Sequence, residues 1–226
     1  MNKVNCYFAL RNKNFGFTLA EVLITIGIIG VVAALTIPVL IQNYKKHVVE
    51  TRLQKFYSEI NQALYRSWID NGQITNLENA YNIPTYNNNL NWVNTNIEPY
   101  MEIISKKANG YKIEVTFKNG SKILVDGVGY DGILFYPVSK PKTDIKGKDC
   151  FAFQFANSQG YYTAGKMIMP FLGNYTRYPK KNTMFTDSTW GCKPNISCSE
   201  RNLSDMCTAV IMQNGWKIPD DYPIRF

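Results

Sequence analysis

Histidine is nearly absent from this chain, which has 226 residues and one histidine, His47. Ser-His-Asp triads and zinc sites with histidine ligands need that side chain inside a folded domain. His47 instead lies just past a long apolar run. The sequence also lacks GxSxG, P-loop and GxGxxG motifs. These absences disfavour a membrane-anchored enzyme, so we expect no enzymatic activity and no cofactor.

Acidic residues are missing from the stretch before Phe15, which carries Lys3, Arg11 and Lys13. Positively charged flanks stay on the cytoplasmic side of a membrane, so we expect the N-terminus inside and the remainder translocated. Elsewhere the excess of 25 Lys and Arg over 17 Asp and Glu is scattered and forms no basic face. Nucleic acid is therefore not an expected partner.

Charge is missing from Val22 to Ile41. A run of about twenty apolar residues spans roughly 30 Å of hydrocarbon as a helix. Because no small-x-small cleavage site follows Leu40, the run is interpreted as a membrane anchor, residues 17–42, and not as a discarded signal. Glu21 stands at its edge, where an unpaired carboxylate costs on the order of 3 kcal/mol.

The next segment, residues 43–72, has an apolar stripe with helical spacing. The stripe consists of Val49, Leu53, Phe56, Ile60, Leu64 and Trp68. Gly72 is a helix stop signal. We expect one long helix through both segments, kinked or loosened at Gly27, Gly30 and Pro38, with its second half covered by a domain.

That domain, residues 73–226, is expected to contain an antiparallel sheet of three or more strands within about residues 111–155. Alternating apolar residues flank Asn119-Gly120, which is a strong hairpin signal, and a further strand is predicted from Cys150 to Phe155. Residues 76–96 are expected to be loop, with a short helix around residues 94–104. The predicted fold class is α+β, with the sheet packed on the amphipathic half of the long helix.

Four of the five cysteines lie in the part expected to be translocated: Cys150, Cys192, Cys198 and Cys207. An even number of cysteines in an oxidising compartment favours two disulfides over free thiols or a metal site. Three pairings are possible, and the sequence does not choose among them. Residues 156–226 have poor periodicity, so we expect an irregular region held by these disulfides, with one short helix near residues 203–213.

Two weaker patterns have alternative interpretations. Asp126, Asp131, Asp144 and Asp149 occur in Asp- and Gly-rich stretches that suggest a calcium site, but Asp-Gly turns explain them better because the EF-hand spacing is absent. Several tyrosines with Lys180 and Lys181 suggest a surface that stacks single-stranded nucleic acid. Packing is the favoured explanation for those tyrosines, which are Tyr161, Tyr162, Tyr175, Tyr178 and Tyr222.

The stretch GFTLAEVLITIGIIGVVAALTIPVL, preceded by a basic leader, resembles the type IV pilin and type II secretion pseudopilin family. The resemblance implies a leader of residues 1–16, cleavage between Gly16 and Phe17 by prepilin peptidase, and N-methylation of Phe17. It places Glu21 fifth after the cut, where its carboxylate would pair with the new amino group and set the register of assembly. Pro38 sits where helix-loosening prolines occur in such subunits.

The resemblance also implies where the chain is located before and after assembly. The chain would start as a single-pass inner (cytoplasmic) membrane protein and then enter a periplasmic or extracellular filament. Its partners would be the lipid bilayer, prepilin peptidase, a membrane assembly platform and other pilin or pseudopilin subunits. The first expectation is a structural filament subunit; the alternative is a minor tip subunit that binds a surface, DNA or an exported protein. The sequence does not distinguish pilus from pseudopilus.

Overall fold

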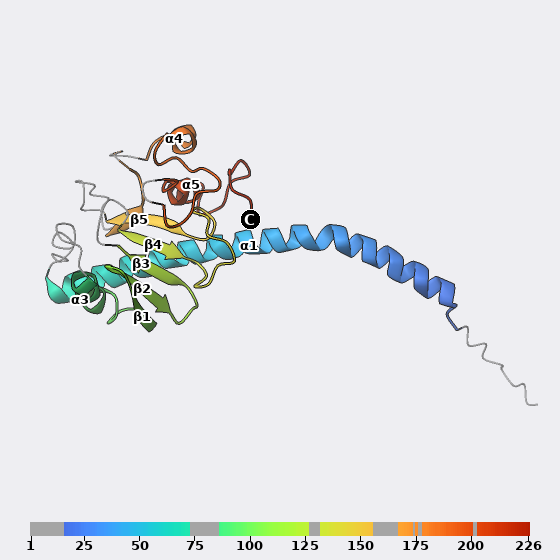
Figure 1. The fold of residues 1–226 in the computed structure, drawn as a ribbon, viewed down its shortest axis with the longest axis horizontal. Coiled ribbons are helices and arrows are strands. Elements are labelled where there is room, and N and C mark those ends of the chain that lie inside the picture. Colours follow the sequence, from blue (N-terminus) through green and yellow to red (C-terminus); the bar gives the residue numbers. More distant parts are fainter. Residues whose placement is uncertain are drawn as a thin grey trace, which may run out of the picture. The chain divides into compact units, whose positions relative to one another are not determined.

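The structure is a computed structural model that describes residues 16–72, 86–126, 132–155, 167–173, 175, 178–200 and 203–226. By its contacts the chain divides into two units, Met1–Gln42 and Asn43–Phe226. Helix α1 (Leu19–Asn71) contributes residues to both units. The second unit holds the remaining helices and all the strands, and is called the head below (Figure 1).

Helix α1 is 53 residues long and continues without a break through Gly27, Gly30 and Pro38. It ends where the sequence predicts, because Gly72 has a φ of +80° and donates its N–H to the carbonyl oxygen of Trp68 at 3.0 Å. This left-handed conformation favours glycine and closes the last turn. Local loosening at Pro38 stays a prediction.

The amphipathic half of α1 carries the head's core along one face. Val49, Leu53, Phe56, Ile60 and Leu64 are all buried, as their spacing predicts. The Phe56 ring stacks on Phe135 of the sheet, with the ring centroids 4.0 Å apart. The predicted core stripe therefore packs on the sheet, and the α+β fold class is confirmed.

The prediction that Trp68, the last residue of the stripe, is buried in the core is wrong. Trp68 is 43% exposed, and its ring contacts Tyr65 on the same helix. Ser67 takes the buried position instead and donates its hydroxyl to Asn96 Oδ1 at 2.8 Å. The stripe ends at Leu64 because a polar contact, not an apolar one, joins the end of α1 to Asn96 of helix α3 (Tyr86–Asn96).

Within the described residues the sheet has six strands in the order β1-β2-β3-β4-β5-β6, and every neighbouring pair is antiparallel. Each strand therefore pairs with the strand before it in sequence (Figure 1). The bounds are β1 (Ile103–Asn109), β2 (Lys112–Phe117), β3 (Lys122–Val125), β4 (Ile133–Tyr136), β5 (Phe151–Phe155) and β6 (Ile168–Pro170).

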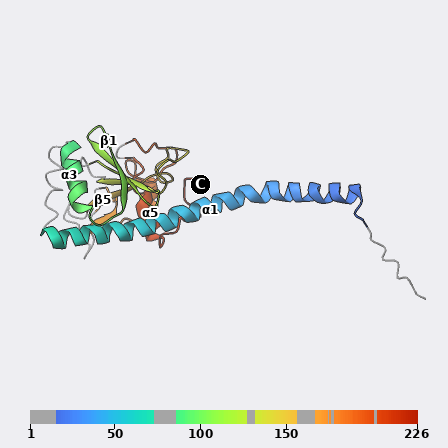
Figure 2. The same ribbon diagram turned by 90° about the horizontal axis from the view of Figure 1, so that it is seen from below.

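The strand register aligns apolar side chains into rows on the face that meets α1. Val115 lies opposite Ile123, which lies opposite Phe135. Because side chains alternate between the faces of a strand, this register keeps every second residue in the core. Figure 2 shows the second half of α1 running along this side of the sheet.

The predicted hairpin between β2 and β3 is confirmed. Gly120 has a φ of +78°, and the Asn119 side chain accepts the backbone N–H of Ser121 at 2.9 Å. An Asx turn followed by a left-handed glycine is the local chemistry that reverses the chain here. The hairpin brings Lys122 of β3 opposite Thr116 of β2.

Several boundaries differ from the prediction. Helix α3 (Tyr86–Asn96) precedes the helix expected around residues 94–104, and residue 103 begins β1. The sheet extends beyond residues 111–155 at both ends, from Ile103 to Pro170. Helix α4 (Lys181–Thr186) and strand β6 lie in the region expected to be irregular, whereas α5 (Cys207–Gln213) lies within the predicted short helix.

Two disulfides join the C-terminal region, Cys150–Cys198 and Cys192–Cys207. Cys150 and Cys198 pack with Tyr136, Leu124 and Leu134 in a small cluster separate from the main core. Leu124 and Leu134 alternate with the residues that face α1, so this cluster lies on the other face of the sheet. The first disulfide thus covers part of that face.

Buried polar contacts fix the ends of the head against α1. The Asn61 side chain accepts the N–H groups of Met167 and Ile168 and donates to the Ile168 carbonyl, at 2.8 to 3.2 Å. It satisfies backbone groups of β6, the last strand of the sheet. Glu50, also buried, accepts the N–H of Ile218 at 2.8 Å and the Lys217 ammonium at 3.1 Å.

We predict that Phe56→Ala lowers the free energy of unfolding of the head by about 3–5 kcal/mol, because it removes a buried ring and leaves a cavity beside Phe135. Urea unfolding of the protein in detergent micelles, followed by circular dichroism, measures the loss. Gln54→Ala, an exposed change on the same helix, should change it by no more than about 0.5 kcal/mol. A loss below about 1 kcal/mol for Phe56→Ala would contradict the packing described.

Candidate processing and assembly site

The predicted cleavage site lies just outside the start of α1. Gly16, Phe17 and Thr18 precede the first helical residue, Leu19, and all three are exposed. Phe17 is 89% exposed. The Gly16–Phe17 peptide bond therefore lies in exposed, non-helical chain beside a helix start. Residues 1–15, which carry the basic leader charges, lie outside the described residues.

Glu21 is hydrogen-bonded within its own chain. Its Oε2 atom accepts the backbone N–H and the hydroxyl of Thr18, each at 2.8 Å, and its own N–H donates to Thr18 Oγ1 at 3.2 Å. This reciprocal pattern is a capping box, with Thr18 at the N-cap and Glu21 three residues later. The box was not predicted, although the spacing Thr-x-x-Glu before an apolar run is its signal.

The capping box changes the interpretation of Glu21. Before any cleavage the carboxylate already has partners, and it lies at the positive end of the helix dipole. The expected pairing with a Phe17 amino group is untested and would add to these contacts. The geometry holds the Glu21 carboxylate one turn from the predicted new N-terminus.

The apolar half of α1 is uncovered along its length. It is long and apolar enough to cross a membrane, and no residue of its most apolar stretch is buried. No other helix among the described residues meets that criterion. Its Val, Leu and Ile side chains, from Leu19 to Ile41, are 44–78% exposed. Nothing lies within 4 Å of a Cβ placed on Gly27 or Gly30. This surface needs lipid or other apolar helices around it.

The amphipathic half of α1 has an unusual outer face. Its most outward residues follow the helical repeat as Thr51, Gln54, Ser58, Gln62, Tyr65 and Ile69, and all are exposed. We call this row the uncharged strip. The solvent side of a helix in a globular protein normally carries its charges. Here the charges flank the strip, at Lys55, Arg66 and Asp70, so the row most open to contact has none.

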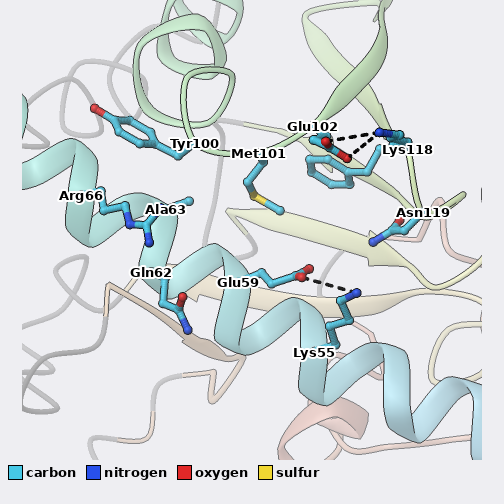
Figure 3. Close-up of a pocket in the computed structure, with 11 residues that line it drawn as sticks. Lys55, Glu59, Gln62, Ala63, Arg66, Tyr100, Met101, Glu102, Lys118 and Asn119 are labelled. Atoms are coloured by element: carbon cyan, nitrogen blue, oxygen red, sulfur yellow. Dashed lines mark hydrogen bonds and ion pairs between the residues drawn. The ribbon is translucent and has the colours of Figure 1, made fainter.

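A groove of about 300 Å³ lies beside the strip, between α1 and the sheet (Figure 3). Its two sides carry ion pairs, Lys55–Glu59 at 3.6 Å on the helix and Lys118–Glu102 at 3.3 Å across from it. Met101 points into the space between them (Figure 3). Besides these two ion pairs, the charged lining of the groove consists of Arg66.

The groove is lined by Lys55, Glu59, Gln62, Ala63, Arg66, Tyr100, Met101, Glu102, Phe117, Lys118 and Asn119.

The structure does not gather the candidate calcium ligands into a site. Asp126 forms an ion pair with Lys112 at 2.7 Å, and its burial raises the pKa of the carboxyl while Lys112 opposes that rise. Asp144 accepts the Ser197 hydroxyl, and Asp149 accepts the Thr143 hydroxyl. Asp131 lies outside the described residues. Across the described part of the chain, no three His, Cys, Asp or Glu side chains are grouped to hold a metal.

The three candidate stacking tyrosines within the described residues are engaged in packing and hydrogen bonds. Tyr222 is buried and donates its hydroxyl to the Gly147 carbonyl at 2.7 Å, and burial raises the pKa of the phenol. Tyr175 donates to Asp187, and Tyr178 is partly buried against Met212. Tyr161 and Tyr162 lie outside the described residues. Packing accounts for the three tyrosines that the structure describes.

Comparison with known families gives two matches. A model described as the prokaryotic N-terminal methylation motif matches residues 11–37, which contain Gly16, Phe17 and the capping box. A second model, described as a family of unknown function (DUF6613), matches residues 39–226. The chain belongs to the DUF6613 family. Its N-terminus carries a prepilin-type methylation motif, which confirms the resemblance to pilins and pseudopilins.

The boundary between the two matches falls inside α1, so a single helix carries both the methylation motif and the first part of the DUF6613 region. The chain is thus a type IV pilin-like or pseudopilin subunit with a DUF6613 head. No curated protein and no solved structure is significantly similar to it.

We predict that Thr18→Val removes the capping box and raises the hydrogen-exchange rate of the Glu21 amide about fivefold, which corresponds to a lost cap of about 1 kcal/mol. Nuclear magnetic resonance of the protein in micelles measures the rate. Thr18→Ser keeps the hydroxyl and should leave the rate near that of the parent. Equal rates in all three proteins would show that the box does not hold the first turn.

Proposed function

We propose that this chain is a structural filament subunit: prepilin peptidase cuts it between Gly16 and Phe17, the new terminus is N-methylated, and α1 carries the subunit from the membrane into a fibre. The observation that carries the proposal is the uncovered apolar half of α1 joined to a methylation motif. Leaving lipid is close to neutral in free energy only where other apolar helices receive the segment. Its partners are then like subunits.

The uncharged strip supports the same proposal and gives the head a second contact. An uncharged row bordered by charges fits an uncharged helix better than it fits a copy of itself, since a parallel self-pairing would bring like charges such as Lys55 together. The segment that meets this requirement is the apolar half of α1 in another copy. Small Ser and Thr side chains in the strip would let the two helices approach closely.

Processing at Gly16 is the first prediction of this proposal. Gly16→Leu should leave residues 1–16 attached, because the peptidase requires a small residue before the cut. Intact-mass measurement of the membrane fraction reports both the leader and the added methyl group. Among the described residues nothing lies within 4 Å of a Cβ on Gly16, so there is space for a side chain at this position. Normal cleavage of the variant would place the processing site elsewhere.

The charge of Glu21 is tested separately from its capping role. Glu21→Gln keeps a capping-box side chain but loses the charge, whereas Glu21→Ala loses both. If Glu21 pairs with the Phe17 amino group, both variants should be cut normally and both should be depleted from sheared filaments. Incorporation of Glu21→Gln at the parent level would show that capping, not charge pairing, is the role of this residue.

The strip predicts a further loss of assembly. Ser58→Glu places an unpaired charge at its centre and should lower incorporation into filaments at least about tenfold, because a charge buried without a partner is strongly unfavourable. Ser188→Glu, at an exposed site of the head, is the matched control and should assemble normally. Equal yields of the two variants in the sheared fraction would remove the strip from the interface.

A structural subunit and a binding tip subunit differ in number. Quantitative mass spectrometry of sheared fibres gives the copy number per fibre: many copies along the fibre support the structural role, and one or a few copies support the tip role.

A further inference from the structure

A buried ion pair lies at the centre of the disulfide-linked region. The Lys146 ammonium is 2.5 Å from Asp205 Oδ1, and the side chains are 2% and 0% exposed. Lys146 also donates to the Glu200 carbonyl oxygen at 2.6 Å. Desolvating two charges offsets most of their attraction, so such a pair contributes little net stability compared with apolar residues of the same volume. Its position has to be explained in another way.

Lys146 contacts the chain on both sides of Cys198. Its backbone N–H donates to the carbonyl oxygen of Ile196 at 2.8 Å, and its side chain reaches the carbonyl of Glu200. These two residues lie two positions before and two positions after Cys198. One lysine therefore brackets that cysteine and fixes where its side chain lies.

The same turn holds the cysteine that pairs with Cys198. Gly147 donates its N–H to the Cys150 carbonyl at 2.8 Å, and Asp149 donates to the Ile145 carbonyl at 2.8 Å. Within this turn Lys146 and Cys150 form an isolated backbone β-bridge. Lys146 holds the chain on both sides of Cys198, and Cys150 lies four residues after Lys146. The two sulfurs are thereby brought together.

The second disulfide depends on the other member of the pair. Asp205 lies two residues before Cys207. A Cβ on Gly147, which has a φ of +82°, would lie 2.6 Å from Cys207 Sγ. The backbone next to Lys146 is thus packed directly on the Cys192–Cys207 disulfide. The ion pair joins the segments that position both disulfides.

Chain statistics favour a different pairing. Cys192 and Cys198 are six residues apart, whereas the disulfides observed span 48 and 15 residues. Because the entropy of loop closure grows with the logarithm of loop length, a first disulfide across six residues closes roughly 20-fold more readily than one across 48 residues and about fourfold more readily than one across 15 residues. For the two complete pairings, in which Cys192–Cys198 leaves Cys150 to pair with Cys207, the bias against the observed pairing is about threefold. Something must oppose Cys192–Cys198 during oxidation.

We propose that the buried Lys146–Asp205 pair selects the disulfide pairing, by assembling the segments of residues 145–150, 196–200 and 205–207 before the thiols are oxidised. Each disulfide then forms as two thiols pass two electrons and two protons to a disulfide oxidant. The pair acts through position, since an ion pair that must find one partner in a low-dielectric site discriminates between chain arrangements.

The test uses the full chain in detergent micelles, reduced, unfolded and reoxidised with a mixture of reduced and oxidised glutathione. Mass spectrometry of unreduced peptides gives the share of each pairing. Lys146→Met combined with Asp205→Leu removes the charges at similar volume, and Asp205→Asn removes one charge only. We expect the share of Cys150–Cys198 to fall at least about threefold in both, because loop closure alone makes it a minority product, with Cys192–Cys198 as the main product.

The matched control is the exposed pair Lys181–Asp221, which is joined at 2.7 Å. Lys181→Met with Asp221→Leu should regain the parental pairing. The correctly paired fraction of the Lys146→Met, Asp205→Leu protein should also unfold at a urea concentration close to that of the parent, since selection requires the pair only before oxidation.

Three results would overturn the proposal. The first is a parental share of Cys150–Cys198 in Asp205→Asn, whether or not the double variant folds. The second is equal mispairing in the Lys181 and Asp221 control. The third is a correctly paired fraction of the double variant that is far less stable than the parent, which would make the pair a source of stability and not of selection.

Discussion

The structure depends on one constraint: a single helix has to satisfy two different surroundings. From Val22 to Ile41 the side chains of α1 are uncharged, mostly apolar and uncovered, and from Val49 to Leu64 one face of the same helix is the centre of a folded core. The first part is stable only in lipid or among similar helices, and the second only beneath its own sheet. The head is therefore built entirely on the half of α1 that can tolerate water on its other side.

The head meets this constraint with one antiparallel sheet, whose two faces are covered by α1 and by irregular chain. Neighbouring strands follow one another in sequence, so the sheet forms from local hairpins, and its apolar rows meet the Phe56 face of α1. The other face is covered in part by irregular chain, which the Cys150–Cys198 disulfide holds against Tyr136. Disulfides take the place of regular structure there.

The long helix, its stop at Gly72 and the hairpin at Asn119-Gly120 were predictable because each has a strong local signal. Strand β1 was not, because its sequence IISKKAN lacks apolar alternation and its pairing with β2 decides its conformation. The following Asn109-Gly110 was an available turn signal. Strand β6 is only three residues long, and its contact with Asn61 lies more than 100 residues away in sequence.

The candidate site and the disulfide region likewise contain features that could be predicted from the sequence and features that could not. Gly16, Phe17 and Glu21 form a local motif. The capping box could also have been predicted, from the four residues Thr18 to Glu21. The choice among three disulfide pairings was not readable, since it depends on where Lys146 and Asp205 meet. Burial of Tyr222 and exposure of Trp68 also depend on packing that no short pattern encodes.

The contact of Glu50 with Lys217 and Ile218 has a mechanical consequence. It fastens the last part of the polypeptide to α1 close to where the helix enters the head, and Asn61 makes a second attachment at β6. A pulling force along α1 therefore acts on the head through these two polar contacts as well as through the packed core. Because the tension is distributed along the helix, no single contact has to carry all of it.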